Sequence, residues 1–407
     1  MSQKRRPYQG RGGSRSFQGK KRSQPYQGRG RSRSFRGRRQ PRSFDPTFLI
    51  NKTRQQPRLE VVKITNEFTD FEIAKKIQAN IKSKGYLTPT PIQDKTIPLI
   101  IQNKDVVGVA NTGTGKTAAF LIPLVNKVFD NQDEKVLVIT PTRELAAQIQ
   151  QEFINIARGL RIYSALCIGG VPMGRQIRQL RQAPQFVIGT PGRLKDLQQR
   201  QILNLNGFTT IVLDEVDRML DMGFIHDVQH LISFFPEKRQ SLFFSATIEG
   251  KVRQVMAKFL KNPVIISVKT GSTTENVNQQ IVRLAGKPKI EVLHDLLIKP
   301  GFDKVLVFGR TKWGMEKLAK ALIDRGFKAT AIHGNKSQNQ RQRALREFKS
   351  GQVKVLLATD VAQRGLDIDS VTHVINFDLP ETQEDYIHRI GRTGRADKKG
   401  FAITLMP

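Results

Sequence analysis

A glycine-rich string of eight residues, Ala-Asn-Thr-Gly-Thr-Gly-Lys-Thr at positions 110–117, limits the folds open to this chain more than any other feature. It follows the apolar run 105–109 and opens a segment with helical periodicity, so we expect a strand, a tight loop and a helix in that order. Backbone N–H groups of such a loop wrap a phosphate chain, and the helix N-terminus adds positive potential. A plain glycine-rich turn is the alternative, but the terminal Lys-Thr pair favours a phosphate site.

Short apolar runs and helix-like segments alternate through the rest of the chain. Strand–helix alternation of this kind predicts an α/β fold with parallel sheets covered on both faces. The predicted helices include 144–157 and 315–322, and the predicted strands are 105–109, 136–139, 186–188, 211–213, 242–244, 305–308, 329–332, 353–357, 374–377 and 401–405. The polar run 269–276 resembles a linker. We therefore predict domains at 59–268 and 278–407, joined by a linker at 269–277.

The first 58 residues differ from the rest in charge and composition. They hold 18 Lys or Arg and one acid, Asp45, which is about half of the chain's formal net charge of +33. Aromatic rings recur every nine residues, at Tyr8, Phe17, Tyr26, Phe35 and Phe44. Such a segment cannot bury enough apolar area to offset its ordering entropy, so we predict a disordered arm over 1–58. Regular rings in a basic tract favour binding to unpaired RNA bases, with a solvated tail as the alternative.

Composition narrows the possible partners and compartments. The excess of basic residues favours a polyanion, either nucleic acid or an anionic membrane surface. No apolar run approaches the length of a membrane span, and no apolar stretch follows the basic N-terminus, so we expect neither a membrane protein nor a secretory signal. The single cysteine, Cys167, excludes an intrachain disulfide and cysteine zinc clusters, and it favours a reducing compartment. We take the cytoplasm as the default, although the arm would also suit a nuclear protein.

An acidic pair provides a second part of the expected phosphate site. Asp214 and Glu215 directly follow the apolar run 211–213. At the carboxyl end of a parallel strand, an aspartate can bind Mg²⁺ and a glutamate can polarise the attacking water. Lys116 would reach the β- and γ-phosphates, and the Thr117 hydroxyl would be a further Mg²⁺ ligand. The residues therefore point to a nucleoside triphosphatase.

Several further strings carry a family resemblance. Asp-Glu-Val-Asp at 214–217, Ser-Ala-Thr at 245–247 and His-Arg-Ile-Gly-Arg-Thr-Gly-Arg at 388–395 resemble motifs II, III and VI of the DEAD-box RNA helicases. Gly85–Gln93 resembles the Q motif, Pro141–Ala146 resembles motif Ia, Val307–Thr311 resembles motif IV, and 358–367 resembles motif V. The resemblance extends over about 66–407. Motif II is a variant, because Val216 stands where the family usually has Ala.

The resemblance implies two tandem RecA-like domains with ATP between them. It implies an ATP site with Mg²⁺ that is formed by Phe68, Gln93, Ala110, Asn111, Thr112, Gly113, Thr114, Gly115, Lys116, Thr117, Gly365 and Asp367. The catalytic residues would be Lys116, Asp214, Glu215, His388, Arg392 and Arg395, with Thr117 and Asp214 holding Mg²⁺. Coupling between hydrolysis and domain closure would use Asp217, Ser245, Thr247 and Arg364. Gln93 would read the adenine ring, and Phe68 would stack on it or pack around it.

The resemblance also implies RNA bound across both domains, mostly through sugar and phosphate and without sequence preference. The RNA contacts would be Arg143, Gly170, Thr190, Gly192, Arg193, Arg310, Gln338, Arg341 and Thr359. ATP-driven closure would bend one strand and open a short duplex locally, or remodel an RNA–protein complex. We expect a monomer.

Two other functions remain open from the residues. A DNA helicase or translocase could use the same paired scaffold, and comparable stimulation by single-stranded DNA and RNA would favour it. An RNA-annealing chaperone could act through the arm without ATP, and its activity would survive Lys116→Ala. We also ask whether Val216 changes coupling or only repacks the protein interior slightly, and we favour repacking.

Overall fold

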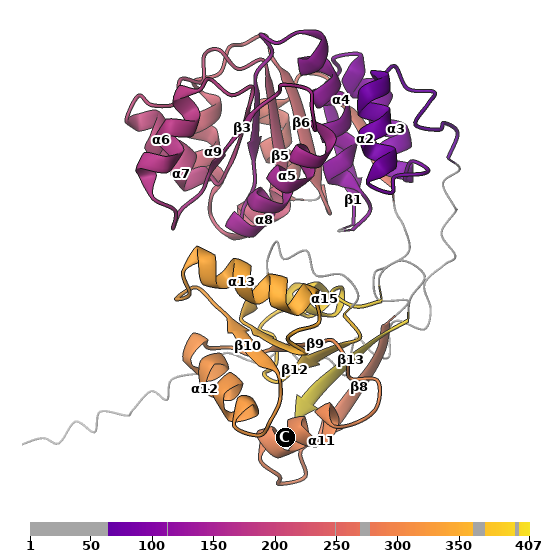
Figure 1. Ribbon diagram of the computed structural model, residues 1–407, viewed down its shortest axis with the longest axis vertical. Helices are drawn as coiled ribbons and strands as arrows, with labels where there is room; N and C mark the ends of the chain where they lie inside the picture. Colours follow the sequence, from indigo (N-terminus) through magenta and orange to yellow (C-terminus); the bar gives the residue numbers. More distant parts are fainter. Residues whose placement is uncertain (1–63, 112, 249, 269–276, 361–370, 395–398) are drawn as a thin grey trace, which may run out of the picture. The chain divides into compact units, whose positions relative to one another are not determined.

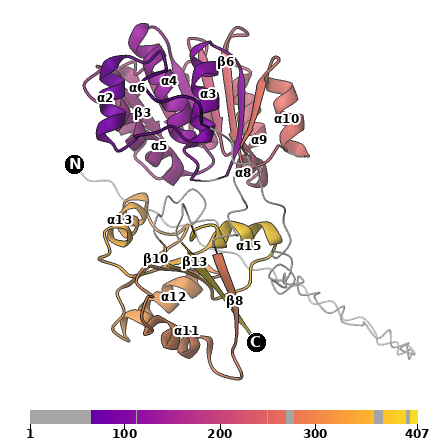
Figure 2. The same cartoon turned by 90° about the vertical axis from the view of Figure 1, so that its right-hand side faces the viewer.

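The computed structural model describes residues 64–111, 113–248, 250–268, 277–360, 371–394 and 399–407. Within these residues the chain forms two parallel sheets, each covered by helices on both faces (Figures 1 and 2). The predicted α/β fold class is therefore confirmed. The predicted arm at 1–58 and the run 269–276 lie outside the described residues, and Val277, the last residue of the predicted linker, begins a strand.

The first sheet has seven strands in the order β3-β4-β2-β5-β6-β1-β7, all paired in parallel. Successive residues of each central strand face opposite sides, so Val106 packs into one cluster and Val107 into the other. The strands are β1 Val106–Ala110, β2 Val136–Ile139, β3 Ser164–Cys167, β4 Phe186–Gly189, β5 Thr210–Asp214, β6 Gln240–Ser245 and β7 Val264–Val268.

Two groups of helices bury the two faces of this sheet. One face is covered by α2 Lys75–Ser83, α3 Pro91–Ile101, α4 Lys116–Asp130 and α5 Arg143–Ile156. The other is covered by α6 Met173–Arg181, α7 Pro191–Gln199, α8 Val216–Asp221, α9 Ile225–Ile232 and α10 Lys251–Phe259. Cys167 is buried on the second face, and burial raises its pKa to about 12.

The second sheet has six strands in the order β10-β11-β9-β12-β13-β8. Its strands are β8 Val277–Arg283, β9 Val305–Phe308, β10 Ala329–Ile332, β11 Val355–Ala358, β12 His373–Asn376 and β13 Gly400–Met406. Helices α11 Lys289–Leu297 and α12 Lys312–Ile323 cover one face. Helices α13 Gln338–Lys349 and α15 Gln383–Ile390 contribute to the clusters on the other.

The ten predicted strands are all present, with ends within two residues of the prediction. Three strands were not predicted: β3, β7 and β8. Each is at the edge of its sheet, and β7 and β8 alternate exposed and covered positions instead of forming a continuous apolar run. Among the described residues, no helix is long and apolar enough to cross a membrane.

Candidate ATP and RNA sites

Strand order brings the predicted phosphate-binding residues to one edge of the first sheet. Strands β5, β6 and β1 are neighbours, so their carboxyl ends lie side by side. The glycine-rich loop follows β1, Asp214 ends β5, and Ser245 ends β6. Ligands of open α/β sheets bind at this edge.

The glycine-rich loop has the backbone conformation that its glycines permit. Gly113 and Gly115 have φ values of 83° and 91°, in the left-handed region, and Gly115 is the N-cap of α4. Lys116 is buried, and its Nζ donates to the carbonyl oxygen of Ala110 at 2.7 Å. The Thr114 hydroxyl donates to the Asn111 carbonyl at 2.8 Å. The lysine therefore lies folded over its own loop; Thr112, also predicted here, lies outside the described residues.

Gln93 connects the predicted Q motif to this loop. Its side chain is fully buried, its Oε1 accepts from the Thr90 N–H at 2.9 Å, and its Nε2 donates to the Gly115 carbonyl at 3.0 Å. A Cβ added at Gly115 would lie 2.5 Å from the same Nε2, and the φ of 91° is one that other residues rarely adopt, so both favour glycine there. Phe68 packs edge-on against Phe71 and Tyr86. Contact of Gln93 and Phe68 with adenine remains a prediction.

Asp214 is a carboxyl group in an environment that disfavours its charge. It is 2% exposed, and burial raises its pKa to about 7. Lys116 and the Glu215 N–H, which donates to Asp214 Oδ1 at 3.0 Å, act in the opposite direction, whereas Glu215 and Asp217 raise the pKa further. A cation beside this carboxylate would offset the cost of its charge.

Glu215 is held in place by a residue that the motifs did not indicate. It is a non-glycine residue at φ 57° and the N-cap of α8. Arg218, one turn later, donates from NH1 to Glu215 Oε2 at 2.8 Å, and the arginine is 4% exposed. A buried arginine thus fixes the carboxylate that we predict to act on water. The i, i+3 spacing was visible in the sequence, but burial of the pair was not.

Hydrogen bonds of main-chain groups lie where we predicted the coupling between motifs II and III. The backbone N–H of Ala246 donates to Asp217 Oδ2 at 3.0 Å, and the Thr247 N–H is 3.4 Å from the Ser245 Oγ. The two motifs are therefore joined through a main-chain N–H, which any residue except proline would supply at position 246. The coupling of Ser245 and Thr247 to Asp217 and His388 stays a prediction.

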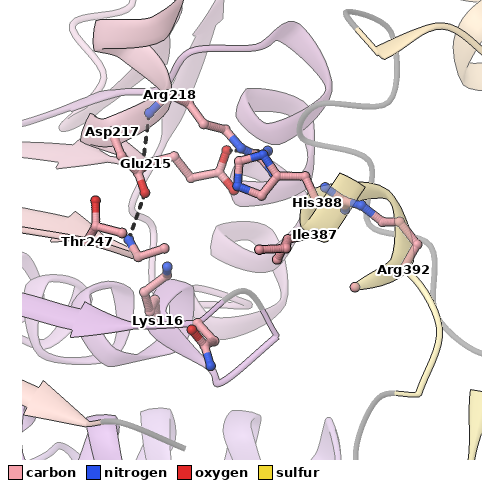
Figure 3. A pocket seen from close by; sticks show the side chains of 11 residues that line it. Lys116, Glu215, Asp217, Arg218, Thr247, Ile387, His388 and Arg392 are labelled. Atoms are coloured by element: carbon pink, nitrogen blue, oxygen red, sulfur yellow. Dashed lines mark hydrogen bonds and ion pairs between the residues drawn. The ribbon is translucent and has the colours of Figure 1, made fainter. Parts of the chain in front are cut away.

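A pocket of about 230 Å³ contains several of the predicted catalytic residues (Figure 3). Lys116, Glu215, Asp217 and Thr247 line it from the first sheet, and His388 and Arg392 line it from the region of α15. Lysine and arginine nitrogens thus surround a space beside carboxylates, which suits a bound polyphosphate. The remaining predicted nucleotide and coupling residues, Arg364, Gly365, Asp367 and Arg395, lie outside the described residues.

Arg389, beside the predicted His388, has a different role. It is 1% exposed, and it bonds both carboxylate oxygens of Asp360 at 2.6 and 2.7 Å. It also donates to Asn376 Oδ1 and the Asp378 carbonyl, and it lies over the Phe308 ring. The arginine joins the carboxyl ends of three strands of the second sheet. Sequence analysis did not single it out.

Some of the predicted RNA residues cluster around glycines and one acid. The Arg143 guanidinium lies against Gly169 and Gly170, where a Cβ would meet it at 2.9 and 2.5 Å. Glu144, which was not predicted, accepts from Gln338 Nε2 at 3.2 Å and pairs with Arg341 Nε at 2.9 Å. Arg193 NH1 donates to the Val171 carbonyl at 3.3 Å, and the Arg310 N–H donates to Asp378. Thr190 precedes α7, Gly192 lies in its first turn, and Thr359 follows β11.

Comparison with known proteins agrees with this arrangement. The family model described as DEAD/DEAH box helicase matches residues 90–255, and the one described as helicase conserved C-terminal domain matches 288–397. The DEAD-box ATP-dependent RNA helicase CshA of Geobacillus kaustophilus is 46% identical over 341 residues, 83% of this chain and 73% of that protein. CshA of Bacillus subtilis is 45% identical over 84% of this chain and 70% of its own length.

Solved structures give the same result. The chain resembles S. cerevisiae Dbp5 bound to RNA and ADP BeF3, with a TM-score of 0.75, 29% identity, and coverage of 84% of this chain and 90% of that one. Two sheets with the predicted motifs at their edges, two matching family models and relatives at 45–46% identity lead to one conclusion. The chain belongs to the DEAD-box family of ATP-dependent RNA helicases.

Proposed function

We propose that this chain is an RNA-stimulated ATPase that unwinds short RNA duplexes locally or remodels RNA–protein complexes. The pocket lined by Lys116, Glu215, His388 and Arg392 carries the proposal, since it combines phosphate-binding, water-activating and charge-stabilising groups. Motif II with valine at its third position, Asp-Glu-Val-Asp, is a variant of the family pattern.

Each group has a role that follows from its chemistry. Lys116 exchanges its bond to the Ala110 carbonyl for oxygens of the β- and γ-phosphates. Glu215, held by Arg218, accepts a hydrogen bond from the attacking water and orients it. Arg392, with Arg395, stabilises the charge that develops on the γ-phosphate oxygens.

The residues present also fit Mg²⁺. Asp214 is a buried carboxyl whose pKa is raised to about 7, so a divalent cation would stabilise its charged form. Thr117 begins α4 one residue after Lys116 and would supply a hydroxyl ligand. Bound there, Mg²⁺ would neutralise charge on the phosphate oxygens. Lys116 would add a single positive charge from the chain itself beside the same phosphates.

RNA binding would use the cluster around Arg143, Glu144, Gln338 and Arg341. Glu144 accepts from Gln338 and pairs with Arg341, so it holds both donors in fixed positions. Contacts from such donors and from glycine-rich turns reach phosphate and sugar, and they specify no sequence. If the closed arrangement of the domains binds both ATP and a bent RNA strand more tightly than the open one, the two ligands shift the protein toward the closed state. Binding of one bent strand then opens the duplex locally.

Several finer features belong to the same proposal. The domains extend over 59–268 and 278–407, and the arm at 1–58 adds RNA affinity through its arginines and rings. The chain acts as a monomer in the cytoplasm; a single protomer supplies the whole pocket, and the buried thiol of Cys167 suits a reducing compartment.

The test is the steady-state ATPase rate of the full chain at fixed salt, measured alone, with single-stranded RNA and with single-stranded DNA. We expect stimulation by RNA and little by DNA. Glu215→Gln should lower the stimulated rate by about 10²-fold or more while RNA still binds. Equal stimulation by DNA would contradict the proposal. Strand annealing that survives Lys116→Ala and disappears when residues 1–44 are deleted would show a separate activity of the arm.

A further inference from the structure

A groove on the second domain lies outside the sites described above. It runs along the outer side of α12 beside β10, which is the edge strand of its sheet and pairs only with β11. Its volume is about 550 Å³. The groove is lined mainly by Trp313, Glu316, Lys317, Lys320, Ile323 and Lys336.

Trp313 stands at the start of this groove. It is the only tryptophan of the chain, it lies in the first turn of α12, and it is 78% exposed. A large ring with so much exposed area contributes little to packing, so a role in the core of the domain does not explain this tryptophan. An exposed indole presents a flat face on which another ring can stack.

The groove also carries positive charge. Lys317 and Lys320 are four and seven residues after Trp313, so on a helix all three lie on one face. In the described part of the chain neither lysine forms a hydrogen bond or ion pair, and both are exposed. The acid of the groove, Glu316, is already paired with Lys336 at 2.9 Å and with His333 at 2.8 Å. An anionic ligand would therefore find two lysines available.

The tryptophan end of the groove adjoins, along the chain, residues that we propose to contact RNA. Arg310 precedes Trp313 by three residues, and Thr311 is the N-cap of α12, accepting from the Gly314 N–H at 3.0 Å. On the other wall, Lys336 precedes Gln338 by two residues. Residues that we propose to contact RNA therefore directly precede or follow both walls of the groove in the sequence.

We propose that the groove binds the continuation of the single-stranded RNA, with one base stacked on Trp313 and the following phosphates contacted by Lys317 and Lys320. The inference rests on the proposed function and lengthens its RNA path. An acidic protein segment would match the charge, but a flat exposed ring that adjoins the predicted RNA contacts favours an unpaired base.

Intrinsic tryptophan fluorescence of the full-length protein tests this directly, because Trp313 is the only tryptophan in the sequence. Oligouridylates of increasing length are titrated, and ATP hydrolysis is followed in parallel. We expect the shortest stimulating oligonucleotide to leave the fluorescence unchanged and longer ones to quench it. ATPase stimulation without quenching at any length overturns the groove alone, whereas absence of stimulation overturns the proposed function. Quenching by poly-glutamate that matches quenching by RNA would assign the groove to an acidic polypeptide.

Variants separate stacking from charge. Trp313→Ala should weaken binding of a labelled long oligonucleotide roughly tenfold and leave stimulation by the shortest one within about twofold. The double variant Lys317→Ala/Lys320→Ala should reduce the dependence of log affinity on log salt by about one to two. Matched controls are Tyr163→Ala, at another exposed ring, and Lys287→Ala/Lys299→Ala, at exposed lysines elsewhere in the second domain. Equal losses in variants and controls would overturn the proposal.

Discussion

The carboxyl edges of the two sheets both bury charged side chains, but they neutralise them differently. In the first sheet Asp214 is buried and accepts from the Glu215 N–H, and burial raises its pKa to about 7. In the second sheet Arg389 is buried as deeply but has Asp360, Asn376 and a carbonyl as partners. The first edge thus disfavours the charge that it buries, whereas the second neutralises its buried charge within the chain. Burial of a charged group alone does not identify a functional site. A buried group whose surroundings disfavour its charge is a better indicator.

Removing Arg389 from the carboxyl edge of the second sheet should have the largest effect on stability. Arg389→Met would leave Asp360 without its bidentate partner and would remove a bond at three strand ends. We expect the second domain to lose about 3–5 kcal/mol of stability, because one partner of a buried pair remains uncompensated. Denaturant unfolding of the full chain, followed by far-ultraviolet circular dichroism, measures the loss.

A matched control comes from an exposed arginine pair in the same domain. Arg343 Nε lies 2.7 Å from Glu347 Oε1, four residues along α13, and the arginine is largely exposed. Arg343→Met should leave the denaturation midpoint almost unchanged, because an exposed ion pair contributes little to stability. If the two variants unfolded at the same denaturant concentration, Arg389 would not be the structural cation that we infer.

The next effect concerns the buried pair of the first sheet. Arg218→Met should destabilise the first domain by about 2–3 kcal/mol and also lower ATPase activity, since Glu215 loses the group that holds it. Adding Glu215→Gln should restore part of the stability but none of the activity. A double-mutant cycle measures the coupling, and additive stability losses would contradict the pairing.

The sequence predicted strands and loops better than it predicted which side chains pair with each other. Ten strands and the glycine-rich loop followed from apolar runs and from the string 110–117, because local pattern determines them. Arg218, Glu144 and Arg389 were missed, because burial and pairing across distant segments leave no local pattern. The bond between Asp217 and Ala246 was missed for a related reason: a main-chain donor has no residue signature.

Val216 lies beside the acidic residues of the first sheet and contributes to packing. It is 1% exposed and belongs to the cluster that buries α8 against the first sheet. Val216→Ala removes two methyl groups and should cost about 1–2 kcal/mol of stability. We expect RNA-stimulated hydrolysis to change less than about threefold, because the Asp217–Ala246 bond does not involve this side chain. A large gain or loss in RNA stimulation would show that Val216 sets the coupling.

The smallest effect is a pH dependence, and it should come from the second domain. His373 stacks between Phe302 and Phe401, with ring centroids 3.7 and 5.0 Å away, and burial lowers its pKa. The unfolded chain therefore binds a proton more readily than the folded one below the ordinary histidine value of 6.5, so the contribution of His373 to stability is lost as pH falls from 6.5 toward the folded pKa. His373→Phe keeps the stack and removes the titration. Thermal unfolding at pH 7.5 and about 5.5 should show a smaller acid loss in the variant than in the parent chain; an equal loss would place the acid sensitivity elsewhere.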